Sequence, residues 1–199
     1  MKRIKLTVAY DGTHYSGWQI QPSAPTIEKE LDTAIYALTG EKLHVTGASR
    51  TDAGVHGLGN VAVFDTESTI PGSRFCYALN RYLPEEISIL ESREVKGDFH
   101  PRHCNTKKTY EYKILNTPFP IPLDTVRMRE AAALLVGEHD FKSFCCVRTQ
   151  TETTVRHVYG LEISEQDAYG AKMFTIRITG NGFLYNMVRI IAGTLVQVG

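Results

Sequence analysis

A carboxylate and a guanidinium lie two residues apart in a glycine-containing stretch, residues 47–56, with the sequence GASRTDAGVH. An ionised Asp52 in this position could act as a nucleophile, and Arg50 offers a planar cation beside it. The flanking glycines let the backbone come close to a ligand. An aspartate in such a loop is more often a turn residue that bonds its own backbone, so the chemical interpretation needs support from other parts of the chain.

Apolar runs on both sides of this stretch predict the strands that hold it. Residues 43–48 and 59–65 are rich in apolar and β-branched types, which is typical of buried strands. Residues 4–10 alternate between apolar and polar types, and this pattern predicts an opening strand with one apolar face. We therefore expect the loop to join two strands of one sheet.

Helix signals fall between these strands. Thr26 is expected to cap a helix whose apolar residues lie on one face, and Gly40 is expected to end it. Pro71 suits the first position of a second helix. Residues 87–95 form an extended stretch that closes the first half of the chain.

The second half has a similar order of elements. The pattern predicts a strand at 108–116, a helix from Asp124 to Gly137, a hairpin of strands at 155–163 and 172–179, and a last helix at 183–196. Strands followed by helices in both halves predict an α+β fold with a mostly antiparallel sheet and the helices on one face.

A metal site is a tempting interpretation of Glu138, His139 and Asp140. Consecutive residues of a loop do not easily converge on one ion, so we predict no metal site there. The four cysteines have no metal-ligand or redox spacing, which predicts free thiols in a reducing compartment.

The composition is that of a soluble protein with a substantial core. The 199 residues carry 22 basic and 22 acidic side chains, so any contact with RNA has to come from a local basic patch. The first residues lead into a strand pattern and not into a signal peptide, and no apolar run reaches the length of a membrane span. We expect a cytoplasmic protein without a membrane segment.

Three stretches resemble the tRNA pseudouridine synthase A family. Residues 50–56, RTDAGVH, are similar to its nucleophile motif, which is long and rare. The sequence YDGT at 10–13, followed by GWQ at 17–19, resembles the opening signature of the family. GFLYNMVR at 182–189 resembles the segment whose arginine pairs with the catalytic aspartate. The resemblance covers nearly the whole chain.

The resemblance implies two ferredoxin-like halves, residues 1–100 and 101–199, that share a mostly antiparallel sheet with the catalytic cleft between them. The chain departs from the family pattern at two places. Ser49 stands where the family more often has glycine, and the connection between residues 115 and 124 is shorter than usual.

Three residues receive catalytic roles from the resemblance. Asp52 is the implied nucleophile, and Arg189 is the cation that pairs with it and that we expect to be buried or half-buried. Alternatively, Arg189 extends from its helix into solvent. Tyr110 is expected to stack on the uracil, and its hydroxyl is the candidate group for moving the C5 proton.

Further residues are expected to contact the substrate. Arg50 could fill the gap left by a base that is turned out of its stack. Trp18 and Gln19 lie on a loop whose aromatic and amide groups could read unpaired bases, although the same loop could instead pack its aromatics against the core. Lys107 and Lys108 belong to a basic segment that could bind RNA or be a solvated face.

The implied function is the isomerisation of uridine to pseudouridine in the anticodon stem-loop region of tRNA, by a homodimer that needs no cofactor and no metal. Whether Asp52 attacks the ribose or the base stays open. An RNA-binding module without catalysis would use the same surfaces and would not need Asp52. A nucleoside- or glycoside-cleaving hydrolase would need a second carboxylate across the scissile bond, and none stands out.

Overall fold

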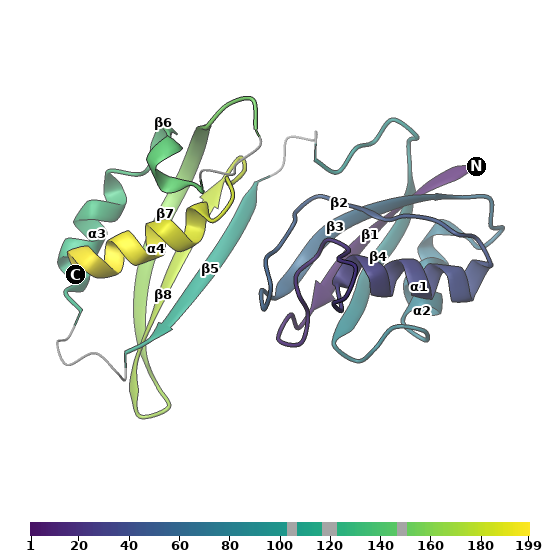
Figure 1. Cartoon of the computed structure of the whole chain (residues 1–199), viewed down its shortest axis with the longest axis horizontal. Helices are drawn as coiled ribbons and strands as arrows, with labels where there is room; N and C mark the ends of the chain where they lie inside the picture. Colours follow the sequence, from purple (N-terminus) through teal and green to yellow (C-terminus); the bar gives the residue numbers. More distant parts are fainter. Residues whose placement is uncertain (103–106, 117–122, 147–150) are drawn as a thin grey trace. The chain divides into compact units, whose positions relative to one another are not determined.

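The computed structural model describes residues 1–102, 107–116, 123–146 and 151–199. The chain divides into two compact units, Met1–Cys104 and Asn105–Gly199, each with its own sheet and apolar core (Figure 1). The sequence-based boundary between residues 100 and 101 lies close to this division. The predicted α+β class is confirmed by two antiparallel four-stranded sheets with associated helices.

The first unit has the βαββαβ order of a ferredoxin-like half. Its elements are β1 (Lys2–Tyr10), α1 (Ile27–Thr39), β2 (Thr46–Gly47), β3 (Gly57–Thr66), a 3-10 turn (Gly72–Arg74), α2 (Phe75–Leu79) and β4 (Ile87–Val95). The strands pair antiparallel in the order β2-β3-β1-β4. The loop that carries Asp52 connects β2 to β3, an edge strand to an inner one.

Alternation in β1 sets the core of this unit. Ile4, Leu6 and Val8 are fully buried on one face and pack in one cluster with residues of both helices. Gly40 ends α1 in the left-handed region, with φ of 73°, as predicted. Thr26 does occupy the cap position, but its hydroxyl makes no capping bond and has no partner within the described part of the chain.

The second unit contains β5 (Lys108–Leu115), α3 (Thr125–Ala133), β6 (Gly137–Asp140), a 3-10 turn (Lys142–Phe144), β7 (Val155–Ala168), β8 (Ala171–Gly180) and α4 (Met187–Val198). Its strand order is β5-β8-β7-β6. This differs from the first unit because β8 follows β7 directly as a hairpin and lies between β7 and β5. A continuous sheet shared by both halves, with a cleft between them, stays a prediction.

Several predicted boundaries are wrong. The strand at 43–48 is only two residues long, and the second helix is a 3-10 turn followed by a five-residue α-helix. Asp124 caps α3 as expected, accepting from two backbone N–H groups, but the helix ends at Ala133. Gly137, with φ of 112°, begins β6, so the stretch expected to be a loop is a strand paired with β7.

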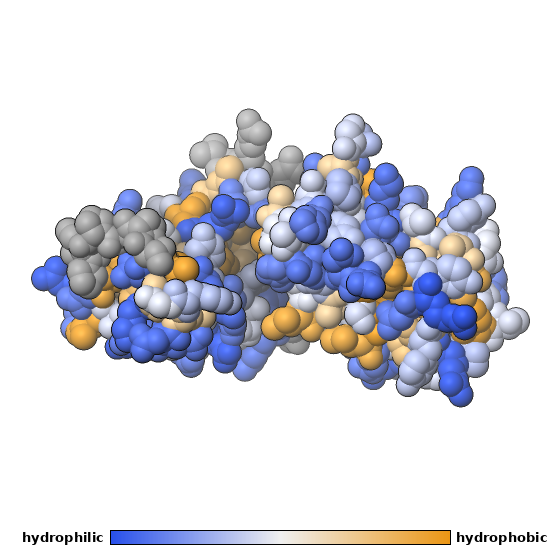
Figure 2. Space-filling view, turned by 90° about the horizontal axis from the view of Figure 1, so that it is seen from below, coloured by the Kyte–Doolittle hydropathy of each residue, from blue (hydrophilic) through white to orange (hydrophobic). Residues whose placement is uncertain are grey.

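The surface is mixed in polarity. Figure 2 shows apolar groups among hydrophilic ones on the face that it displays, and Leu58 and Tyr77 are among the exposed apolar residues. The thiols of Cys76 and Cys145 form no disulfide within the described part of the chain. No described helix has the length and hydropathy needed to cross a membrane.

An ion pair ties β1 to β3. Arg3 binds Asp65 in a bidentate manner, with Nε and Nη2 at 2.8 and 2.7 Å from the two carboxylate oxygens, and both side chains are largely covered. The third nitrogen, Nη1, donates to the carbonyl of Phe99 at 3.0 Å. The hydrogen bonds from Arg3 lower the pKa of the Asp65 carboxyl below its ordinary value.

We expect Asp65→Asn to destabilise the first unit by about 1 kcal/mol at neutral pH, because the charged acceptor is lost. A carboxyl whose pKa is lower in the folded state than in the unfolded state stabilises the fold when the pH is above the unfolded-state pKa of about 3.9. This stabilisation is lost as the pH falls through the folded-state pKa. The difference in free energy of unfolding between wild type and variant, from urea titrations, should therefore decrease as the pH is lowered below the unfolded-state value of about 3.9, and should disappear once the folded-state carboxyl is protonated. Glu91→Gln, which removes an exposed pair with 3.9 Å between its charged atoms, is the matched control with little effect at either pH.

Candidate active site

The start of the Asp52 loop continues the sheet. The N–H of Ala48 donates to the carbonyl of Val61 at 2.7 Å. The side-chain amide of Asn60 on β3 then forms hydrogen bonds with both backbone groups of Ser49. It accepts from the N–H at 3.2 Å and donates to the carbonyl at 3.0 Å. These bonds hold the chain next to β3 up to the residue before Arg50.

Thr51, directly before Asp52, is held through its backbone and its side chain. Its carbonyl accepts from the N–H of Trp18 at 3.0 Å. Its hydroxyl lies 2.9 Å from the phenol oxygen of Tyr10, at the end of β1. The position of Asp52 along the loop therefore depends on the segment that follows β1.

A turn closes the loop after Asp52. The N–H of Val55 donates to the carbonyl of Asp52 at 3.2 Å, and Gly54 adopts a φ of 77° that few other residues tolerate. The N–H of Gly54 donates to the carbonyl of Tyr15 at 3.1 Å, which again joins the loop to the opening segment.

The last residue of the loop, His56, is bound by residues of the YDGT signature. Its Nδ1 accepts from the N–H of Gly12 at 3.2 Å when it is unprotonated, or donates to a carboxylate oxygen of Asp11 at 3.0 Å when it is protonated. Two hydrogen bonds from Thr13 to that oxygen are the largest cause that lowers the pKa of the Asp11 carboxyl. Asp11 therefore stays an anion beside the imidazole.

The side chains of Asp52 and Arg50 take no part in these anchoring bonds. Asp52 is half-buried and Arg50 is exposed. Neither side chain makes a hydrogen bond or ion pair with any residue that the structure describes. A rigid backbone with an uncommitted carboxylate and guanidinium can receive a ligand without first breaking internal bonds.

The ring of Trp18 packs against Gly47, at the start of the stretch that carries Asp52. Its side chain has no exposed surface, and its ring lies so close to Gly47 that a Cβ there would be 2.5 Å from Cε2. A covered ring cannot stack on a base, so the prediction that Trp18 contacts RNA is wrong and the alternative, packing against the core, holds. The neighbouring Gln19 is exposed, and its contact with RNA stays a prediction.

The remaining predicted residues lie in the second unit. Tyr110 on β5 is half-buried, with its ring edge-on to Phe183 at 5.2 Å between centroids. Arg189 on α4 is exposed, which contradicts the expected burial, and it forms no ion pair within the described ranges. Lys107 is exposed, with Nζ 5.0 Å from the ring centre of Tyr159. Pairing of Arg189 with Asp52, and the contacts of Tyr110 and Lys107 with the substrate, stay predictions.

The chain matches the family described as tRNA pseudouridine synthase over residues 6–103 and 131–199. The chain belongs to the tRNA pseudouridine synthase family. The match includes the whole Asp52 loop and the segment of Arg189. Tyr110 and the two predicted lysines fall in the stretch between the matched parts.

Relatives in this family are similar to the chain over its full length. Proteins named tRNA pseudouridine synthase A from Ruminiclostridium cellulolyticum, Acetivibrio thermocellus and Brevibacillus brevis are each 46% identical to it. Each alignment covers 100% of this chain and 85% of the relative. The chain is thus an enzyme of the isomerase class, and the nucleophile resemblance is part of a full-length similarity.

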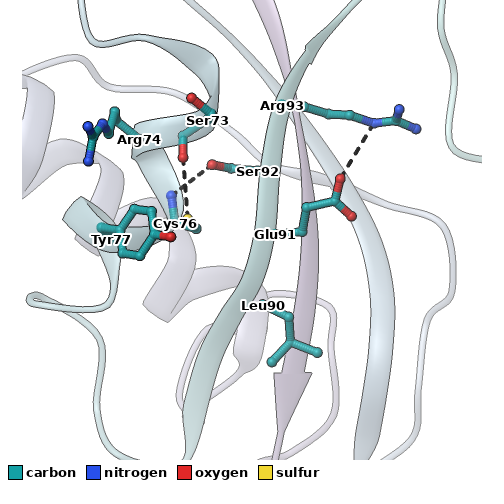
Figure 3. Close-up of a pocket in the computed structure, with 8 residues that line it drawn as sticks. All are labelled: Ser73, Arg74, Cys76, Tyr77, Leu90, Glu91, Ser92 and Arg93. Carbon is teal, nitrogen blue, oxygen red and sulfur yellow. Dashed lines mark hydrogen bonds and ion pairs between the residues drawn. The ribbon is translucent and has the colours of Figure 1, made fainter.

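A surface hollow of about 640 Å³ lies between α2 and β4, and none of its lining residues belongs to the synthase motifs (Figure 3). Its lining residues are Ser73, Arg74, Cys76, Tyr77, Leu90, Glu91, Ser92 and Arg93. The hydroxyl of Ser92 is already used, since it donates to the carbonyl of Gly72 at 2.7 Å and accepts from the N–H of Cys76 at 2.8 Å. This serine fastens α2 to the sheet.

Sequence reasoning missed two residues that hold the synthase loop. Asn60 was counted only as part of a strand, although asparagine is uncommon there and its amide suits the backbone of an adjacent loop. Arg102 received no role of its own from the sequence, yet its Nε donates to the carbonyl of Gly47 at 2.9 Å. No local pattern indicates this second contact.

Gly12 is predicted to be essential for the loop. A Cβ at this position would lie 2.1 Å from the carbonyl oxygen of Val55, inside the turn that follows Asp52. We expect Gly12→Ala to cost about 1–3 kcal/mol of stability and to lower turnover, because the turn has to move. Thermal unfolding and initial rates measure the two effects.

Gly59→Ala is the control for this prediction. Gly59 lies on the next strand, where the nearest atom to an added Cβ is the methyl group of Thr7 at 3.6 Å, an ordinary contact. Equal stability and activity of the two alanine variants would contradict the close approach of Gly12 to the turn.

Proposed function

We propose that this chain converts uridine to pseudouridine in tRNA, with Asp52 as the nucleophile. The observation that carries the proposal is the Asp52 loop, which is fixed by bonds from two strands and the opening segment while its carboxylate is uncommitted. The printed names of the relatives, tRNA pseudouridine synthase A, support the substrate.

The reaction rearranges atoms that the uridine already contains. The glycosidic bond between C1′ and N1 breaks, the uracil turns in the site, and a bond forms between C1′ and C5. The proton on C5 leaves and N1 gains one, so atoms and electrons balance. A covalent bond to a carboxylate can divide this change into easier steps. An isomerisation needs no external oxidant or reductant, and we propose that no cofactor takes part.

Two residues of the second unit complete the proposed catalytic group. Arg189 supplies the cation that keeps Asp52 ionised, and its exposure on α4 leaves the guanidinium accessible to a partner. Tyr110 places its ring against the uracil, and its hydroxyl assists the removal of the C5 proton. The edge-on contact with Phe183 restrains that ring.

The remaining proposed contacts concern RNA binding. Arg50 occupies the space that the extruded uridine leaves in the stack, which offsets part of the cost of a few kcal/mol for extrusion. Gln19, Lys107 and Lys108 contact the surrounding RNA. By the resemblance, the target lies in the anticodon stem-loop region, and the reaction takes place in the cytoplasm, where tRNA is abundant.

Asp52→Asn tests the nucleophile. The amide keeps the shape of the carboxylate but loses its charge and nucleophilicity, so tritium release from tRNA labelled at uridine C5 should fall by at least about a thousandfold. Affinity for tRNA should stay within about twofold, since phosphate contacts dominate it. Residual turnover of a few per cent would rule out the covalent role.

The same assay separates the proposal from other activities. Tritium release with the base retained in the polynucleotide indicates isomerisation. Free uracil would indicate a hydrolase instead, and binding with neither product would indicate an RNA-binding module.

Arg189→Ala tests the proposed pairing with Asp52. Because Arg189 is exposed within its own unit, the free energy of unfolding should change by less than about 0.5 kcal/mol. Turnover should fall about a hundredfold or more, since a paired carboxylate loses its cation at a cost of roughly 3 kcal/mol or more. Arg127→Ala on α3 removes the same charge from an exposed helix position and should leave turnover unchanged. Similar rates for the two variants would refute the pairing.

We further propose that the enzyme is a homodimer in which one tRNA contacts both subunits. The chain has 199 residues, which corresponds to a radius of gyration of about 16 Å for a compact protein, and tRNA is several times longer. A two-fold arrangement would let one subunit bind the body of the tRNA while the other presents Asp52 to the uridine.

Mixed dimers test this arrangement. One subunit carries Asp52→Asn, and the other carries charge reversals at Lys107 and Lys108, so each homodimer lacks one function. If a single tRNA contacts both subunits, mixing should restore tritium release that neither homodimer has. Light scattering should give twice the chain mass, and a monomeric mass with full activity would exclude the model.

A further inference from the structure

The segment that follows β4 is fastened to the first sheet at two points. The carbonyl of Phe99 accepts from Nη1 of Arg3 at 3.0 Å, and Nε of Arg102 donates to the carbonyl of Gly47 at 2.9 Å. Between these points Pro101 is buried, and Nδ1 of His100 accepts from the N–H of Arg102 at 3.2 Å. The guanidinium of Arg102 is thereby held beside β2, at the entrance to the Asp52 loop.

Only one of the hydrogen-bonding nitrogens of this guanidinium has a partner in the described part of the chain. Nε is used by Gly47, whereas the two terminal amino groups bond to no residue in the described ranges, and the side chain is exposed. Arg50 follows Gly47 by three residues and is also exposed without a partner there. Two cationic side chains with unused donors are therefore attached to one short piece of backbone, Arg50 as part of it and Arg102 through its bond to Gly47.

The two charges act on each other. The pKa of Arg102 lies below its ordinary value. The larger cause is that neighbouring atoms remove part of the water from the charged group, and the second cause is the nearby charge of Arg50. Glu28 acts in the opposite direction, more weakly than either. One Glu28 oxygen already accepts from the N–H of Ile20 at 3.1 Å. The like charges are thus incompletely balanced in the free protein.

An anion between the two guanidiniums would relieve this repulsion. Phosphate suits the position best, because a guanidinium presents its N–H groups in a planar fork that matches two phosphate oxygens. The site adjoins a loop on which an extruded nucleotide is expected to react, and every nucleotide carries a phosphate on each side of its ribose. An RNA strand therefore supplies the required anion at the required place.

We propose that Arg102, together with Arg50, binds one backbone phosphate of the RNA next to the uridine that reaches Asp52, and so acts as a positioning residue. The inference rests on the proposed RNA substrate. The bond from Arg102 to Gly47 fixes the bound phosphate relative to the first sheet. The same sheet carries the Asp52 loop, so it determines which nucleotide of the RNA strand lies at Asp52.

Salt dependence of RNA binding tests the phosphate contact. Arg102→Gln retains an N–H donor for Gly47 but removes the charge. Relative to wild type, it should weaken binding of an anticodon stem-loop RNA on the order of tenfold and reduce the slope of log K against log salt concentration by about 0.7–0.9. Arg102→Lys should keep the wild-type slope. Arg93→Gln, an exposed arginine of the same unit on β4, should leave both quantities unchanged.

Chemically neutralised phosphates provide a test that does not depend on the variant. In a series of stem-loop RNAs, one phosphate at a time carries a methyl group in place of a charged oxygen. Wild-type protein should lose about tenfold in affinity at one phosphate flanking the target uridine, and Arg102→Gln should lose nothing further at that position. Equal losses in both proteins at every position, or an unchanged salt slope for Arg102→Gln, would overturn the inference.

Kinetics distinguish positioning from a purely structural role. Arg102→Gln should raise KM for tRNA on the order of tenfold with kcat close to wild type, whereas a distorted loop would lower kcat. Tritium release by wild type is measured in parallel. Phosphate dependence without tritium release would overturn the proposed isomerisation and keep the phosphate site. Release without phosphate dependence would overturn only the role of Arg102.

Discussion

The hydrogen bond from the N–H of Trp18 to the carbonyl of Thr51 is the constraint on which the candidate site depends. The Asp52 loop has little regular structure, so its backbone groups need partners from other segments. Gly17 allows the two segments to meet, since a Cβ there would lie 2.5 Å from the carbonyl oxygen of Thr51 and its φ is 97°. The opening segment and the loop therefore act as one structural unit, although they are far apart in the sequence.

Features set by local chemistry were predictable from the sequence. Alternation in β1, the glycine that ends α1 and the aspartate that caps α3 depend on near neighbours along the chain. β6 was missed because Gly137–Asp140 has no strand pattern of its own and is extended only through pairing with β7. The start of the second helix was predicted at Pro71, but the first turn after this proline is a 3-10 turn and the α-helix begins only at Phe75, because a proline marks a possible start and not the type of the turn that follows it.

The candidate site likewise contains residues that the sequence predicted correctly and residues that it did not. Asp52 and Arg50 were found because their types and spacing form a long motif, and the family match supports it. Trp18 was misassigned because an aromatic residue on a loop has the same sequence appearance whether it is covered or exposed. Arg102 was missed because its partner is 55 residues away, and no property of either segment predicts that contact. Arg189 was expected to be covered by its apolar helix, yet it lies on the solvent side of α4.

The covered indole of Trp18 also gives the protein a natural optical reporter. Trp18 is the only tryptophan in the chain, its ring lies against Gly47 at the base of the Asp52 loop, and its backbone N–H donates to the carbonyl of Thr51. Indole emission shifts with the polarity and rigidity of its surroundings, so any rearrangement of this loop changes the intrinsic fluorescence of the whole protein. The response of the loop to added RNA can therefore be followed without a label, at the residue that supports it.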